Sequence, residues 1–369
     1  MNKKVVVELC MSPDLGGLEL YMVRAAKALK DDFKVISIIN EDTKLEQYYN
    51  QSDNYIKIKK TSNMFMISAA KKFANIIDEH DVEVIHLHWT KDIPFVVLAK
   101  ILSKKKPKLA QTRNMTMTRF KDDFYHRLMY KNINLMLPVT YQVKEQLEKF
   151  IPKDIRPKIE VLYMGSEKVD MLNKAEIATL KDELNFKENS FNVGMVGRIN
   201  EAKGQHLLIE ALSLIDNTDV NAYFVGHEME EGYIKTLKKL AKNLGVETRV
   251  HFLGFMKNPH HFFQACDTIV LASQRETFGL VVIEAMQVGT VVIGSNSGGV
   301  VEIIDDEKTG LLFDVGSSNS LAEKIEKLMD NSKLLETVSL DGQRKCKNKF
   351  SNEKQFRKLS LILKDLSES

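Results

Sequence analysis

Short apolar segments rich in β-branched residues alternate with amphipathic segments along most of the chain. Apolar runs of four to six residues are typical of buried strands, and apolar positions three and four residues apart are typical of helices. In the first half we predict strands at 4–9, 34–39, 82–87, 108–111 and 135–139, and helices at 18–29, 64–77, 94–102 and 142–150. In the second half we predict strands at 191–196, 222–225, 250–253, 268–271 and 290–293.

This alternation predicts an α/β protein with two doubly wound domains. Strands that are apolar on both faces and separated by helices form parallel sheets covered on both sides. The length of 369 residues also favours two domains over one. The periodicity lapses between Ile151 and Lys174, so we place the domains at residues 1–165 and 175–349. A last amphipathic helix, at 352–366, has no strand partner of its own.

Composition and cysteine usage exclude several classes of protein. Hydrophobic residues make up 44% of the chain and charged residues 28%, which is typical of globular proteins. Cys10, Cys266 and Cys346 are far apart and have the spacing of neither a disulfide framework nor a zinc site. The longest apolar stretch contains Glu284, and the first residues do not resemble a signal peptide. We therefore expect a cytoplasmic protein.

Charge is divided unevenly between the two halves. Residues 1–170 contain 29 basic and 22 acidic residues, a net charge of +7, and the remainder has a net charge of −4. A basic half can face an anionic membrane, a phosphorylated substrate or nucleic acid, but the aromatic interleaving of a nucleic-acid site is missing. One group of lysines could contact anionic headgroups or be solvated surface. Its members are Lys100, Lys104, Lys105, Lys106 and Lys108.

Candidate functional residues directly follow two of the predicted strands. Parallel sheets bind ligands beyond the carboxyl ends of their strands. The first strand is followed by Gly16 and Gly17, whose backbone could approach an anion at a helix N-terminus or form a structural turn. The strand at 191–196 is followed by Arg198 and Lys203. These two cations could grip a diphosphate, or they could be solvated surface charges.

A third strand-end loop carries two carboxylates. Glu276 lies in the loop and Glu284 lies eight residues later, two turns along an apolar helix, so both can face one cleft. A charged residue in such a helix is hard to explain as surface decoration. Gly279 lets the backbone come close to a ligand. No acidic pair has the spacing of a D-x-D metal motif, so we expect no metal.

Together these residues resemble a known signature. Glu276 and Glu284, preceded by Gly197-Arg198 and Lys203-Gly204, are similar to the signature of the retaining glycosyltransferases of family 4. The resemblance covers most of the chain and includes the runs 81–88, 224–226, 253–255 and 297–302. It implies the GT-B fold, in which two Rossmann-like domains with parallel sheets face each other across a cleft. It also implies that the last helix, within residues 350–369, crosses back onto the first domain.

The resemblance implies a role at the donor for each of these residues. Arg198 and Lys203 would bind the donor diphosphate, because fixed cations stabilise the negative charge that grows on the leaving group. Glu276 would bind hydroxyls of the donor sugar, and Glu284 the ribose hydroxyls. The other implied donor-binding residues are Gly16, Gly17, Gly226, Phe255, Thr277, Phe278, Gly279 and Leu280. The nucleotide sugar is a substrate, and no cofactor is implied.

The acceptor side departs from the family pattern. Many relatives carry a histidine after the strand that ends near Gln111, whereas this chain has Arg113, a permanent cation that cannot act as a base. We assign Arg113 to acceptor or phosphate binding, with a plain surface arginine as the alternative. His86 and His88 lie on one predicted strand, and we expect them to point to opposite faces. His88 is then the better candidate for the acceptor side, with a structural core histidine as the alternative.

We therefore predict a retaining glycosyltransferase that moves a sugar from a nucleotide diphosphate sugar, UDP favoured over GDP, to an acceptor hydroxyl. The expected acceptors are lipid-linked or oligosaccharide intermediates of bacterial lipopolysaccharide, capsule or exopolysaccharide. Peripheral contact with the inner face of the cytoplasmic membrane is one interpretation of Met117, Phe120, Phe124 and Met129, and a helix core stripe is the other. Two alternatives remain for the function: a sugar-nucleotide epimerase of the same architecture, which would need no acceptor, and a non-enzymatic two-domain binding protein.

Overall fold

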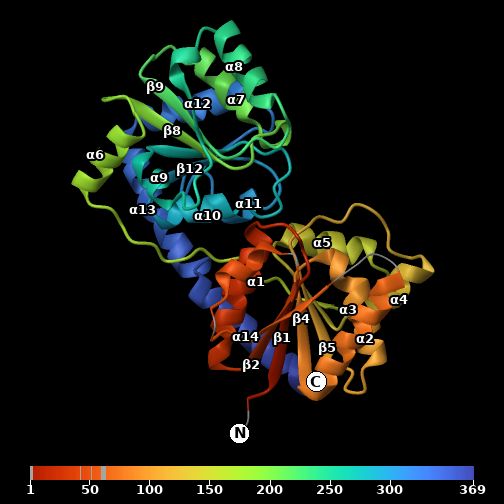
Figure 1. The fold of residues 1–369 in the computed structure, drawn as a ribbon. Coiled ribbons are helices and arrows are strands. Elements are labelled where there is room, and N and C mark those ends of the chain that lie inside the picture. Colours follow the sequence, from red (N-terminus) through yellow and green to blue (C-terminus); the bar gives the residue numbers. More distant parts are fainter. Residues whose placement is uncertain (1–2, 42, 51, 60–63) are drawn as a thin grey trace. The chain divides into compact units, whose positions relative to one another are not determined.

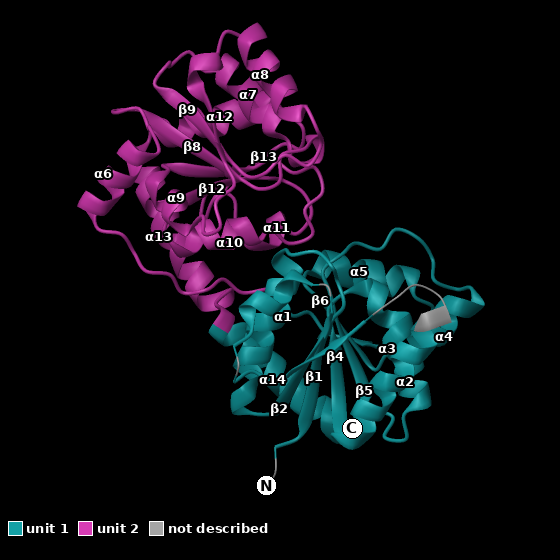
Figure 2. Ribbon diagram, in the orientation of Figure 1, with its two compact units in different colours: residues 1–163, 353–369 teal, residues 164–352 magenta. Residues whose placement is uncertain are grey.

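The computed structural model describes residues 3–41, 43–50, 52–59 and 64–369 (Figure 1). The chain divides into two compact units, which Figure 2 shows in different colours. Unit 1 comprises residues 1–163 and 353–369, and unit 2 comprises residues 164–352. The chain therefore passes between the units twice, after Tyr163 and before Glu353.

Unit 1 is built on a parallel sheet that contains, among the described residues, seven strands in the order β3-β2-β1-β4-β5-β6-β7. Apolar strand residues and the apolar faces of the helices form its core. The strands are β1 (Val5–Cys10), β2 (Lys34–Asn40), β3 (Tyr55–Ile58), β4 (Val82–Leu87), β5 (Lys108–Arg113), β6 (Leu135–Pro138) and β7 (Lys158–Ile159). The helices are α1 (Gly17–Ala28), α2 (Met64–Glu79), α3 (Ile93–Leu102), α4 (Phe124–Asn132), α5 (Tyr141–Phe150) and α14 (Asn352–Glu368), whose first residue still belongs to unit 2.

Unit 2 repeats this arrangement with a six-stranded parallel sheet of order β10-β9-β8-β11-β12-β13 within the described part of the chain. The strands are β8 (Phe191–Val196), β9 (Val220–Val225), β10 (Val250–Gly254), β11 (Thr268–Leu271), β12 (Val291–Ser295) and β13 (Leu311–Phe313). The helices are α6 (Lys174–Glu183), α7 (Gln205–Leu214), α8 (Tyr233–Asn243), α9 (His260–Ala265), α10 (Leu280–Gln287), α11 (Val300–Ile303), α12 (Ser318–Met329) and α13 (Ser332–Lys349). In both units the strand order changes direction beside the first strand, as in doubly wound folds.

The predicted strands all occur, and three more were missed. β3 and β7 lie at the two edges of the sheet in unit 1, and β13 lies at an edge in unit 2. Each has only two to four residues, and most residues of β3 and β7 are partly or fully exposed. Edge strands bury less apolar surface than central ones, so their sequences lack a strong hydrophobic signal.

Helix α14 completes unit 1. The Phe356 ring packs 5.4 Å from the Tyr21 ring of α1, and Leu359 and Leu363 are buried. The Lys364 Nζ atom lies 2.5 Å from Oδ1 of Asp32. The apolar face of α14, a helix for which the sequence offers no strand partner, is thus buried against unit 1.

Candidate functional site

The loop after β8 places two cations at the carboxyl edge of the sheet in unit 2. Gly197 directly follows β8, and Arg198 is exposed beside it. A one-turn helix, η4 (Glu201–Lys203), then leads to Gly204, which has a left-handed φ of +77°. A Cβ atom at Gly204 would lie 2.4 Å from the carbonyl oxygen of Ala272, so glycine is required for this loop to pack beside the end of β11.

Lys203 and Glu276 join the loops that follow β8 and β11. The Lys203 Nζ atom lies 2.8 Å from Oε2 of Glu276, and the two side chains are 25% and 19% exposed. The backbone N–H of Gly299 donates to the Glu276 carbonyl oxygen at 2.8 Å. Gly298 has φ of +62°, and a Cβ atom there would lie 2.0 Å from the same oxygen. The loop after β12 therefore fixes the backbone that carries Glu276.

Helix α10 begins directly after the loop that follows β11 and carries Glu276. Its N-cap, Gly279, has φ of +96° and no side chain to bind the first backbone N–H groups, which can then donate to a ligand. Phe278 is buried with its ring edge-on to Phe350 at 6.1 Å, so it can offer a ligand only its backbone. Glu284 is half-buried on α10. Burial raises the pKa of the nearby Cys346 thiol to about 11, and the charge of Glu284 adds to this effect.

The ends of β8, β9 and β10 lie side by side. The backbone N–H of Gly226, after β9, donates to the carbonyl oxygen of Gly254 at 2.8 Å. A Cβ atom at Gly226 would come within 1.8 Å of the Gly197 carbonyl oxygen. Phe255 follows β10, is 69% exposed and meets His227 edge-to-face at 6.0 Å. The structure thus brings Gly226 and Phe255 to the same sheet edge as the two cations, and their role at the base stays a prediction.

In unit 1, one carboxylate contacts both candidate histidines. His86 Nδ1 lies 2.9 Å from Oε1 of Glu8, and His88 Nε2 lies 2.6 Å from Oε2. His86 Nε2 also lies 2.8 Å from Oγ1 of Thr112, and all four side chains are buried. The expectation that His86 and His88 point to opposite faces is wrong, because side chains two residues apart on a strand share a face.

The surroundings of His88 fit the core interpretation. Burial and the adjacent His86 lower the pKa of His88 to about 4, despite its hydrogen bond with Glu8. Burial by itself would raise the pKa of the Glu8 carboxyl, but the two histidines hold it below its usual value. Sequence reasoning missed Glu8, although a lone carboxylate within the apolar run 5–10 was a usable signal. These three side chains could also group around a metal ion, their ligand atoms lying within 4.8 Å of one another.

Arg113 lies at the carboxyl end of β5 and is 6% exposed, so the surface-arginine alternative is wrong. Its Nε donates to the Met115 carbonyl oxygen at 2.8 Å, one terminal nitrogen donates to Oγ1 of Thr90 at 2.8 Å, and the other donates to the Thr116 carbonyl oxygen at 3.0 Å. Arg113 also borders a cavity of about 350 Å³ within unit 1. Its assignment to acceptor or phosphate binding stays a prediction.

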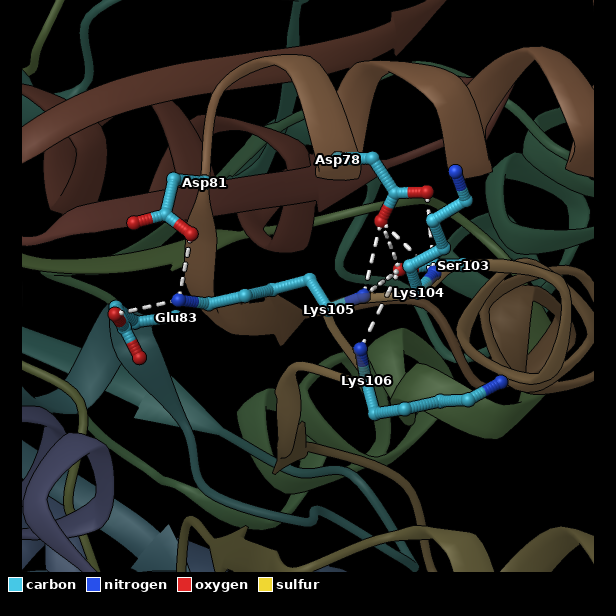
Figure 3. A network of polar contacts seen from close by, with 7 residues as sticks. All are labelled: Asp78, Asp81, Glu83, Ser103, Lys104, Lys105 and Lys106. Atoms are coloured by element: carbon cyan, nitrogen blue, oxygen red, sulfur yellow. Dashed lines mark hydrogen bonds and ion pairs between the residues drawn. The ribbon is translucent and has the colours of Figure 1, made fainter.

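Lysines of the 100–108 group have structural contacts of their own. Lys105 Nζ lies 2.6 Å from Oδ1 of Asp81 and 3.0 Å from Oε1 of Glu83 (Figure 3). Asp78 accepts hydrogen bonds from the backbone N–H groups of Lys104 and Lys105. This loop precedes β5 and therefore lies at the opposite end of that strand from Arg113. The group stabilises unit 1 far from the candidate acceptor side.

Met117, Phe120, Phe124 and Met129 do not form one stripe. Met117 and Met129 are buried, whereas Phe120 and Phe124 are 64% and 84% exposed. The core-stripe interpretation is wrong, because α4 begins only at Phe124 and the first two residues lie in the loop before it.

Gly16 and Gly17 lie at the start of α1, with Gly16 as an N-cap in extended conformation. They belong to unit 1, whereas the cations and carboxylates of the donor signature belong to unit 2. Their predicted donor-binding role rests on the resemblance alone.

Each unit matches a glycosyltransferase family. Residues 176–345 match the family described as "Glycosyl transferases group 1", and residues 8–143 match "Glycosyl transferase 4-like". Together the two matches span most of the chain. The chain is a glycosyltransferase. Because both halves match glycosyltransferase families, the epimerase and the non-enzymatic binding protein are set aside.

Curated relatives match this glycosyltransferase over much of its length. "Uncharacterized glycosyltransferase MJ1178" of Methanocaldococcus jannaschii is 26% identical, with 99% of each chain covered. "Capsular polysaccharide biosynthesis glycosyltransferase CapM" of Staphylococcus aureus is 26% identical over 86% of each chain. An "N-acetylgalactosamine-N,N'-diacetylbacillosaminyl-diphospho-undecaprenol 4-alpha-N-acetylgalactosaminyltransferase" of Campylobacter jejuni is 31% identical, over 57% of this chain and 55% of its own.

Solved structures confirm the predicted GT-B fold with two Rossmann-like domains. A glycosyltransferase from Rickettsia africae superposes with a TM-score of 0.89 at 23% identity, with 99% of each chain covered. Anabaena Alr3699/HepE in complex with UDP gives a TM-score of 0.86 at 22% identity, covering 98% of this chain and all of its own. The same protein has been solved with UDP-glucose, at a TM-score of 0.84. Within the described residues, no helix has both the length and the hydropathy that crossing a membrane requires.

Proposed function

We propose that this glycosyltransferase transfers a sugar from a UDP-sugar to an acceptor hydroxyl with retention of the anomeric configuration. The observation that carries the proposal is the contact of Lys203 with Glu276, which brings a cation and a carboxylate together at the carboxyl edge of one sheet. We assign the cation to the diphosphate and the carboxylate to the sugar. Arg198 extends from the same loop as Lys203 and is exposed to a ligand.

The proposed roles follow from charge. An ammonium group has three N–H donors, so Lys203 can keep its contact with Glu276 while it binds a phosphate oxygen. Arg198 would bind the same diphosphate with its planar guanidinium. Both cations then stabilise the charge that develops on the leaving nucleotide. Glu276 would accept hydrogen bonds from the sugar hydroxyls, and Glu284, from α10, those of the ribose.

Retention would need no nucleophile from the enzyme. In a front-face reaction the leaving phosphate oxygen accepts the proton of the acceptor hydroxyl as the new glycosidic bond forms on the same side. Arg113 stands where many relatives have a histidine, and a guanidinium cannot take that proton. The cations that bind the phosphate would also make a metal ion unnecessary for charge neutralisation.

The names of relatives support the substrate classes. HepE has been solved with UDP and UDP-glucose, which favours UDP over GDP as the donor nucleotide. CapM acts in capsular polysaccharide biosynthesis, and the Campylobacter enzyme acts on a diphospho-undecaprenol intermediate. We therefore propose a lipid-linked or oligosaccharide acceptor in bacterial surface polysaccharide synthesis, at the cytoplasmic face of the membrane.

A donor screen tests this function. UDP and GDP sugars are compared by thermal shift, and the best donor is then incubated with extracted bacterial lipids. We expect UDP-sugars to stabilise the protein most and mass spectrometry to find a glycosylated lipid. The anomeric coupling constant of the product, measured by NMR, then reports the stereochemistry. An inverted product would refute retention, and stabilisation by GDP-sugars alone would refute the donor.

A further inference from the structure

Arg113 is a buried cation without an acidic partner among the described residues. Its guanidinium contacts one hydroxyl group and two backbone carbonyl oxygens, and it has no carboxylate at ion-pair distance. Burying a charge without a counter-ion is costly. Each terminal nitrogen makes one hydrogen bond in the structure, so each keeps a second N–H for a ligand.

The cavity beside Arg113 has a cationic lining. We call it the Arg113 cavity, and it is bordered by Thr90, Lys91, Ile93, Pro94, Arg113, Lys121, Tyr125, His126, Met129 and Tyr130. This lining contains one arginine, two lysines and one imidazole but no carboxylate. Asp123 lies near the cavity but is engaged by His126. It accepts a hydrogen bond from the backbone N–H of His126, and its Oδ2 lies 2.5 Å from Nδ1 of the same residue. The positive charge of the cavity therefore suits an anion.

Lys121 shows that the cations act together. Burial lowers the pKa of its ammonium group, and the charges of Arg119 and Arg113 lower it further. A dianion between Lys121 and Arg113 would relieve this repulsion. With about 350 Å³ of space, the cavity can hold a phosphate or diphosphate group.

One rim of the cavity is apolar and exposed. Helix α4 presents Phe124, Tyr125 and Leu128, which are 84%, 50% and 40% exposed. Tyr125 also lines the cavity, so the apolar rim adjoins the cationic interior. A ligand that carries both a phosphate and an apolar chain would contact both regions.

We propose that the Arg113 cavity binds the phosphate group of an acceptor whose apolar chain lies along Phe124 and Leu128. Arg113 and Lys121 are the specificity-determining cations, and the term acceptor rests on the proposed function. Phosphate binding in this cavity does not depend on transfer, so it can be measured even if the proposed function fails.

Trp89 provides a direct measurement. It is the single tryptophan of the chain, directly precedes Thr90 of the cavity, and has Lys91 Nζ 5.2 Å from its ring centroid. Its fluorescence is titrated with geranyl diphosphate and with inorganic pyrophosphate. The titrations use the full chain with Lys203→Ala, so that diphosphate binding at the donor site of unit 2 is weakened.

We expect geranyl diphosphate to bind at least tenfold more tightly than pyrophosphate. Arg113→Gln and Lys121→Gln should each weaken both ligands at least tenfold, and Phe124→Ser should remove only the advantage of the geranyl chain. Lys131→Gln removes a lysine charge from an exposed position of α4 outside the lining and should change little. Lys121 is only half-buried, so its variant serves even if Arg113→Gln fails to fold.

Two results would overturn the inference. Equal losses in Lys121→Gln and Lys131→Gln would show general electrostatic attraction in place of a cavity. Equal affinity for the two ligands in the parent protein would eliminate an acceptor with an apolar chain.

Discussion

The ammonium group of Lys203 contacts the carboxylate of Glu276, which lies 73 residues later in the chain, at 2.8 Å. The two residues follow β8 and β11, which are hydrogen-bonded neighbours in the sheet. Because carboxyl ends of parallel strands share one edge, the fold brings the two loops together before any ligand binds. A site held in this way would lose little freedom on binding the proposed donor, which favours catalysis.

The cations of this site should be needed for turnover. We expect Arg198→Ala and Lys203→Ala each to lower kcat/KM about 100-fold or more, because each removes a charged contact to the leaving diphosphate. Steady-state kinetics with the preferred donor measure the loss. Lys239→Ala changes an exposed lysine of α8 and serves as the matched control. Rates near that of the parent enzyme in both site variants would contradict the diphosphate assignment.

Substitution of Glu276 and of Glu284 should have different effects, the first on turnover and the second on nucleotide binding. Glu284→Ala should weaken UDP binding by about 1.5 to 3 kcal/mol, as expected for a lost charged hydrogen bond. Glu276→Ala should mainly lower kcat and leave UDP affinity little changed, because UDP lacks the sugar that Glu276 is proposed to bind. Calorimetry with UDP, beside kinetics, measures both, with the exposed Glu323→Ala as control. If both site variants lose UDP affinity equally, the roles are divided wrongly.

Activity should not require a divalent metal. The proposed diphosphate site has Arg198 and Lys203 for charge neutralisation, so we expect the rate to persist in excess EDTA. Glu8, His86 and His88 are grouped closely enough to hold a metal ion, so a variant of this group is tested as well. If EDTA abolishes activity in the parent and Mg²⁺ or Mn²⁺ restores it, the metal-free mechanism is wrong. The same chelation experiment on His88→Gln then shows whether this group holds the metal.

The sequence predicts the central strands and the glycosyltransferase family well because both rest on local patterns. The spacing of Glu276 and Glu284 is visible in the chain itself, and the apolar runs identify the central strands. Contacts between distant segments are less visible. Nothing near Glu276 reveals that Gly298 must lack a side chain to pack on its carbonyl oxygen. For Arg113 the sequence left a surface position open as the alternative, and only the fold, which places it beside Thr90, shows that it is buried.

The buried histidines illustrate the same limit. Glu8 and His88 are 80 residues apart, and only the pairing of β1 with β4 brings them together. The two-residue period of a strand places His86 and His88 on one face. The expectation of opposite faces was therefore a wrong application of this period, which the sequence alone could have corrected. The partner carboxylate was marked by its position inside an apolar strand.

The buried His88 should make unit 1 less stable in mild acid. Its pKa falls from 6.5 to about 4 on folding. The unfolded chain therefore binds more protons between these values, and stability falls as the pH drops from about 6.5 to 4. The loss should be about 3 kcal/mol at most. Urea unfolding followed by Trp89 fluorescence measures this slope. His88→Gln should flatten it, whereas His80→Gln, at a half-exposed position in the turn directly after α2, should leave it unchanged.

Helix α14 offers a matched pair for testing how the chain's last segment stabilises unit 1. Leu359 is fully buried, whereas Leu361, two residues later on the same helix, is 55% exposed. Leu359→Ala should lower the free energy of unfolding of unit 1 by about 2 to 5 kcal/mol, because it removes buried methyl groups and leaves a cavity. Leu361→Ala should change it by less than about 0.5 kcal/mol. Urea unfolding followed by Trp89 fluorescence reports on unit 1, where the tryptophan lies. If the two variants unfold at the same urea concentration, α14 does not pack on unit 1 in solution, and the assignment of residues 353–369 to that unit is wrong.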